Sequence, residues 1–216
     1  MGNRRKLRKI VMWLLVLLLS AAILYVLEGC PSFTAEMAFR RKEKQNMIGP
    51  AEFISTIDFP HGRYDHMMIG KSEYGYTFFE WDDGTGWDNG ILSYILKQEG
   101  ATLYCTYWPY GSSQYSSDWL PIFAFADVPA AVSARLTLKT TQEGETVTYP
   151  LSATKSKDGY YLFSWKILTL RANDYRLVQQ LITGKYSDYV LEGTAQAVLE
   201  LYNAKGELVG TYHFDK

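Results

Sequence analysis

Residues 194–214 read TAQAVLELYNAKGELVGTYHF, and this stretch indicates the fold class. In its first half apolar and polar side chains alternate, with Ala197, Leu199 and Leu201 on one side of the chain. A period of two is typical of a strand with one buried face. The turn-forming run 203–206 separates this strand from a second alternating one. We therefore expect an antiparallel hairpin at this end of the sequence.

The residues before this hairpin repeat the same pattern and add one helix. Four more alternating runs are separated by turn signals: 120–125, 134–140, 146–151 and 160–167. A helix with Asn173 as its cap follows, and four apolar residues share one of its faces: Leu177, Val178, Leu181 and Ile182. Short strands at this spacing favour a β-sandwich. We predict an immunoglobulin-like β-sandwich over residues 118–216 with one inserted short helix.

Residues 51–117 form a second, aromatic-rich β region. Aromatic and small residues alternate over 74–78 (YGYTF), which predicts a half-buried strand. Run 91–97 is compatible with either a strand or a helical turn. We expect a small β domain here, so the fold is mainly β.

The N-terminal part predicts a membrane anchor. Residues 1–9 hold five basic residues and no acid, and residues 10–27 are an apolar run without charge. Eighteen residues at about 1.5 Å each span about 27 Å, close to the ~30 Å hydrocarbon core of a bilayer. Basic flanks stay in the cytoplasm. We therefore expect a cytoplasmic tail (1–9), a single-pass signal anchor in the lipid bilayer (10–28) and an extracytoplasmic C-terminal part.

Residues 29–50 predict a juxtamembrane stalk helix. Glu36 lies near its start and four basic residues lie toward its end, which suits the helix dipole. We interpret it as a solvated stalk that lifts the β domains off the bilayer. Its apolar residues Phe33, Met37 and Met47 are compatible with contact either to those domains or to the lipid surface.

Charge and composition exclude several classes of function. Five of the 22 basic residues but none of the 23 acidic ones precede the apolar run, so the rest of the chain carries a net charge of −6. An acidic exterior is a poor partner for nucleic acid. Two cysteines and three histidines do not favour a zinc site, and we expect no cofactor.

The segment 27–30 (LEGC) resembles a lipobox, the bacterial Leu-x-Gly-Cys motif whose cysteine carries lipid, although Glu28 is unusual there. This resemblance implies that Cys30 is a candidate for lipidation. A lipid on Cys30 would also keep the chain on the membrane.

The segment 102–106 (TLYCT) resembles the Thr-Leu-x-Thr-Cys signature of sortases, with its last two letters reversed. The resemblance implies a nucleophilic Cys105 with His61 or His66 as the proton-transfer partner. The alternative interpretation is that Cys105 is a small apolar core residue.

Two further sets of residues are candidate binding sites. Asp82, Asp83 and Asp88 could coordinate Ca²⁺, but the spacing is not that of an EF-hand, and solvated turn acids are the alternative. A ligand surface is suggested by acidic and aromatic residues in or near loops: Trp87, Asp88, Tyr110, Tyr115 and Trp119. Rings beside acids and hydroxyl groups grip sugars or peptides, although the same rings could instead pack a small β domain.

The layout of basic tail, anchor, stalk and β-rich exterior resembles that of uncharacterised single-span extracytoplasmic proteins of Gram-positive bacteria. This resemblance implies a location and no activity. We expect a non-enzymatic, membrane-anchored binding or accessory module of the cell envelope, with a glycan, peptide or protein partner. The alternatives are a sortase-like cysteine hydrolase or transpeptidase and a lipoprotein-type substrate-binding component.

Overall fold

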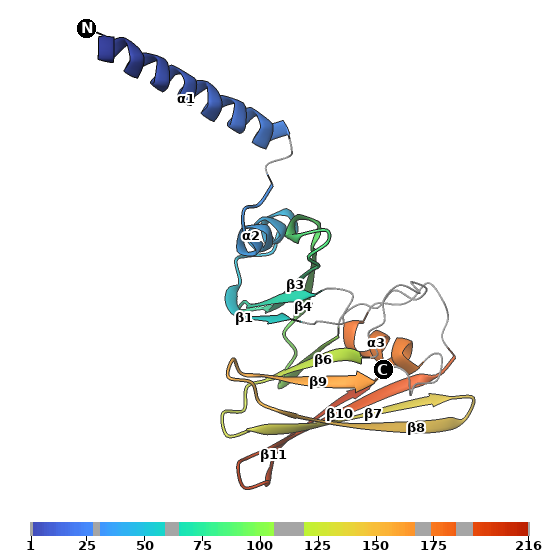
Figure 1. The fold of residues 1–216 in the computed structure, drawn as a ribbon. Helices are drawn as coiled ribbons and strands as arrows, with labels where there is room; N and C mark the ends of the chain where they lie inside the picture. The colour runs from blue at the N-terminus through green and yellow to red at the C-terminus, as the bar shows by residue number, and fades with distance from the viewer. Residues whose placement is uncertain are drawn as a thin grey trace.

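The computed structural model describes residues 2–27, 31–58, 65–105, 119–166, 174–184 and 192–215. Within these ranges the chain is mainly β, with an apolar helix at its N-terminal end (Figure 1). The helices are α1 (Gly2–Leu27), α2 (Ala35–Gln45), α3 (Asp174–Thr183) and the short 3-10 helix η1 (Trp87–Asn89). The segment Lys6–Val26 of α1 is long and apolar enough to cross a membrane, and none of it is buried against the rest of the chain.

The strands form three antiparallel sheets. Sheet A has the order β1-β2-β3-β4, with bounds Glu52–Asp58, His66–Lys71, Gly75–Trp81 and Ile91–Leu96. Sheet B has the order β5-β6-β9, with bounds Ala101–Cys105, Trp119–Ala126 and Tyr160–Lys166. Sheet C has the order β11-β10-β7-β8, with bounds Leu208–Asp215, Thr194–Tyr202, Ser133–Gln142 and Glu145–Thr154. The predicted C-terminal hairpin is confirmed, because β10 pairs with β11 from Gln196 to Tyr202.

The elements stack in layers, in the order α2, sheet A, sheet B and sheet C, as Figure 1 shows. Each gap between layers holds its own core. Phe39 of α2 packs on Phe79 and Trp81 of sheet A. Phe78 of sheet A packs on the Tyr104 ring of sheet B, with ring centroids 3.6 Å apart. Strand β3 is therefore buried on both faces, and the half-buried strand expected at 74–78 was wrong.

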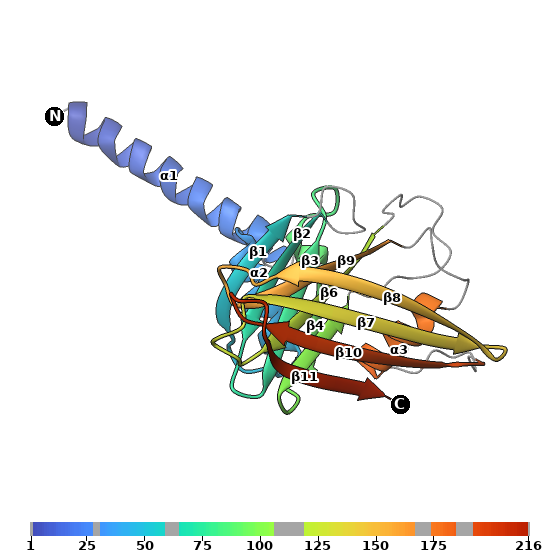
Figure 2. The same cartoon turned by 90° about the horizontal axis from the view of Figure 1, so that it is seen from below.

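Sheets B and C face each other around the largest core and form a two-sheet sandwich. From below, the four strands of sheet C lie side by side (Figure 2). Side chains of β10 and of α3 fill this core, as the alternation and the helical face predicted: Leu177, Val178, Leu181, Ile182, Ala197, Leu199 and Leu201.

The strand β5 precedes the domain boundary expected between residues 117 and 118 and pairs with β6, which follows it. Ala101–Cys105 pairs residue by residue with Ile122–Ala126 of β6, so β5 belongs to sheet B. The expected boundary between 117 and 118 thus falls between two paired strands. Residues 91–96, which the sequence left open, form the edge strand β4.

Candidate functional site

Two of the expected ligand residues, Trp87 and Asp88, bind the segment that follows the apolar helix. Both carboxylate oxygens of Asp88 accept the backbone N–H of Ser32, at 3.0 and 3.1 Å, and Asp88 also pairs with the Arg41 guanidinium. The indole Nε1 of Trp87 donates to the Ser32 carbonyl oxygen at 2.7 Å. We call these four residues the linker cluster. The polar groups expected to hold a ligand are engaged by the chain itself.

A second buried contact attaches α2 to sheet A. Glu43 is only 2% exposed, and its Oε1 accepts the backbone N–H of Ala51 at 2.9 Å. Arg40 donates through Nη1 to Glu43 Oε2 at 2.8 Å and to the Ala51 carbonyl oxygen at 2.6 Å. A buried carboxylate is stable only with such partners. The expectation of a solvated stalk was therefore wrong, because α2 is packed and bonded to the β region.

The three acids proposed for calcium point to separate partners. Asp82 accepts the backbone N–H and the hydroxyl of Thr85, at 2.7 and 2.6 Å, which is a turn-forming arrangement. Asp83 contacts His66, and Asp88 belongs to the linker cluster. Across the described residues, no group of three or more His, Cys, Asp or Glu side chains is placed to hold a metal ion.

His66 lies between two surface acids rather than beside the cysteine with which it was paired. Its Nδ1 is 2.7 Å from Asp58 Oδ1 and its Nε2 is 2.9 Å from Asp83 Oδ1, while its ring stacks on Trp81. The hydrogen bond to Asp58 is the largest cause that raises the pKa of His66, and Asp83 adds to it. This cluster joins β1, β2 and the loop after β3.

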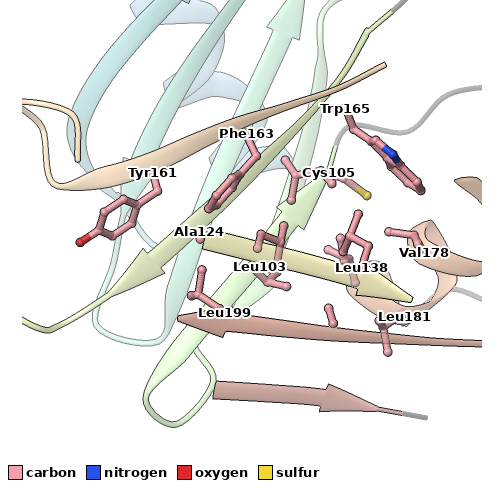
Figure 3. Close-up of a cluster of buried hydrophobic side chains, with 14 of the residues drawn as sticks. Leu103, Cys105, Ala124, Leu138, Tyr161, Phe163, Trp165, Val178, Leu181 and Leu199 are labelled. Atoms are coloured by element: carbon pink, nitrogen blue, oxygen red, sulfur yellow. The ribbon is translucent and has the colours of Figure 1, made fainter. Parts of the chain in front are cut away.

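Cys105 lies in the core between sheets B and C. Its side chain is 1% exposed and sits among Leu138, Trp165 and Val178 (Figure 3). Burial raises the pKa of its thiol to about 12. A nucleophilic cysteine needs access and a lowered pKa, and Cys105 has neither. The structure supports the core interpretation and gives no support to the sortase-like alternative.

The other expected site residues lie outside what the structure describes. These are Cys30, His61, Tyr110, Tyr115 and the side chain of Trp119. The ligand surface expected around Tyr110 and Tyr115, and the lipidation of Cys30, therefore stay predictions.

A buried polar pair between sheets A and B was not anticipated. The Tyr104 hydroxyl donates to Glu80 Oε1 at 2.8 Å, and both side chains are buried. Burial is the largest cause that raises the pKa of Tyr104 well above its usual 10.0. The clue in the sequence was an acid, Glu80, within an aromatic-rich strand. Because a buried carboxylate requires a donor, this position predicts an internal partner rather than a solvent-facing site.

A depression of about 900 Å³ lies at the corner where β8 turns into β9. Serine and threonine hydroxyl groups, Arg135 and two tyrosines border it: Ser133, Ser152, Thr154, Ser156, Tyr160 and Tyr202. Arg135 faces Glu200 across the β7–β10 pair, and Glu200 Oε2 accepts the Tyr202 hydroxyl at 3.0 Å. This feature could not be expected from the sequence, because its lining residues come from four strands, β7 to β10, and from the loops at Ser156 and Gly206.

Comparison with known proteins adds no relationship: no family model matches the chain, and searches of curated proteins and of solved structures found no significant match.

Proposed function

We propose that this chain is a non-enzymatic binding or accessory module of the cell envelope, anchored by α1 with its N-terminus in the cytoplasm. The observation that carries the proposal is the attachment of α2 to sheet A through Glu43 and the linker cluster. Since only residues 28–34 separate α1 from α2, this attachment holds the β layers close to the end of the apolar helix. Basic residues before the apolar run support the orientation, because such residues remain in the cytoplasm.

The strand order supports an immunoglobulin-like sandwich as the displayed part. Numbered one to seven from β5 to β11, the two sheets read 1-2-5 and 7-6-3-4. Constant-type immunoglobulin domains read 1-2-5-4 and 7-6-3, so the only difference is the sheet that the fourth strand joins. We infer that the sandwich spans β5 to β11, and that α2 with sheet A is a platform on the outer face of sheet B.

The depression beside Arg135 is the best described candidate for the binding surface. Hydroxyl groups, tyrosine rings and a guanidinium suit a partner that offers hydroxyl and carboxylate groups. Peptidoglycan carries both kinds of group, and it lies outside the membrane of a Gram-positive cell. We propose an envelope glycan or its peptide as the ligand class.

Sedimentation with insoluble cell-wall sacculi from a Gram-positive bacterium tests this proposal with the detergent-solubilised full chain. We expect the wild-type chain to pellet with the sacculi and Arg135→Ala to pellet several-fold less. Lys139→Ala is the matched control, because Lys139 is also an exposed cation on β7 and does not border the depression. Equal pelleting of the two variants would exclude the depression as the binding surface. Failure of the wild-type chain to pellet would exclude a wall ligand.

A further inference from the structure

The outward side of α2 and the residues that flank this helix carry large apolar side chains that stay exposed within the described chain. Met37 is 46% exposed, and Phe33 and Met47, which flank the helix, are 69% and 94% exposed. Met37 and Lys44 lie seven residues apart, two turns of an α-helix, and so share one side of α2. The buried residues Ala38, Phe39 and Glu43 face sheet A instead. We call Phe33, Met37, Lys44 and Met47 the outer face of α2.

The position of this face indicates what covers it. The ring of Phe33 stacks on that of Tyr25 with centroids 5.2 Å apart, and Tyr25 lies in the last turns of the apolar span. Tyrosines at the ends of spans sit at the level of the lipid headgroups. Figure 1 shows α2 on the side of sheet A from which α1 leaves. Phe33, the first residue of the outer face of α2, therefore lies beside a tyrosine that belongs at the level of the lipid headgroups.

The chemistry of the face fits the same partner. A phenylalanine and two methionines beside a lysine are typical of a helix that lies in the membrane interface, with apolar groups among the acyl chains and the cation among anionic headgroups. Arg40 and Arg41 are not available to headgroups in the same way, because they pair with Glu43 and Asp88. The cation of the outer face, Lys44, is exposed.

We propose that the outer face of α2 lies on the surface of the bilayer that α1 crosses. The helix is then a two-sided support, with one face bonded to sheet A and the other resting on lipid. This inference rests on the proposed membrane anchoring. It extends that proposal, because it fixes which layer of the protein faces the bilayer and places sheet C farthest from it.

Photocrosslinking to lipid tests the proposal. The full chain is reconstituted in vesicles of equal parts phosphatidylcholine and phosphatidylglycerol, with p-benzoylphenylalanine replacing Met37 or Met47. The matched control carries the probe in place of Leu208, which is also exposed but lies in sheet C. Vesicle flotation after a carbonate wash reports anchoring separately.

We expect lipid adducts from positions 37 and 47 at several-fold higher yield than from position 208. A chain that floats but gives equal yields at the three positions, or that crosslinks to a second copy at 37 and 47, would overturn the lipid-facing assignment and leave the anchoring intact. A chain that the carbonate wash removes from the vesicles would overturn the anchoring, and with it the proposed function.

Discussion

Glu43→Ala is expected to release α2 from sheet A without unfolding the sandwich. The substitution leaves the buried N–H of Ala51 without its acceptor, which costs about 1–3 kcal/mol. Arg40 loses one partner, but its side chain is 37% exposed and it keeps the Ala51 carbonyl oxygen, so this loss adds at most about 1 kcal/mol. The attachment of α2 should weaken by about 1–4 kcal/mol, which corresponds to roughly a 5- to 900-fold change in the opening equilibrium.

Hydrogen exchange measured by mass spectrometry reads this opening directly. Amides of α2 should exchange faster in Glu43→Ala by that factor, while amides of β7 and β10 keep their wild-type rates, because local opening need not involve the sandwich. Glu36→Ala is the control, since Glu36 is an exposed acid in the first turn of the same helix. Unchanged exchange in α2 of Glu43→Ala, or an equal increase in Glu36→Ala, would refute the bonded attachment.

Three further predictions concern the other clusters. Asp88→Ala should weaken the attachment of Ser32 by about 1 kcal/mol, since the side chains of Asp88 and Arg41 are partly exposed. Trypsin should then cut at Arg41 roughly fivefold faster than in wild type. Cys105 should resist iodoacetamide at pH 8 until urea is added, because its thiol is buried and the pKa of this thiol is raised to about 12. Peptide mapping distinguishes labelled Cys105 from labelled Cys30. Labelling of Cys105 in the folded chain would contradict its core position. Because the pKa of His66 is raised in the folded chain, His66 contributes stability that is present below its usual pKa of 6.5 and is lost as pH rises through the higher folded value. Urea unfolding across this pH range should show the loss of stability, and His66→Gln should abolish this pH dependence. An unchanged pH profile in His66→Gln would disprove the role of His66.

Alternation and helical periodicity predicted the strands and helices that have one buried face. Leu199 and Leu201 of β10, and Val178 of α3, are buried as expected, because one buried face leaves a direct mark on a sequence. A helix was expected within residues 29–50, and α2 forms there over Ala35–Gln45, with Thr34 accepting the Met37 N–H as its cap. Patterns within one element were therefore sufficient for most secondary structure.

The docking of α2 could not be predicted in the same way. Its basic run resembles a solvated face, and its fully buried residues are few: Ala38, Phe39 and Glu43. The burial of Glu43 can be explained only when its partner, the N–H of Ala51, is known to lie beside it. That proximity depends on the turn after α2, which periodicity does not report.

The candidate sites failed for a related reason. Trp87 and Asp88 have the chemistry of a ligand site, but their partner is Ser32, more than fifty residues earlier in the chain. Cys105 resembles a nucleophile in its motif, while its burial depends on packing between two sheets. Residue type alone does not distinguish a side chain that binds an external ligand from one that binds another segment of the same chain.

Accessibility of Leu208→Cys to a membrane-impermeant maleimide in intact Gram-positive cells tests the proposed location most directly. Leu208 is exposed in sheet C, whereas Cys105 is buried, so the chain without the added cysteine measures any background from Cys30. We predict labelling in intact cells as complete as that after lysis. Labelling that appears only after lysis would place the β layers inside the cell and contradict the account.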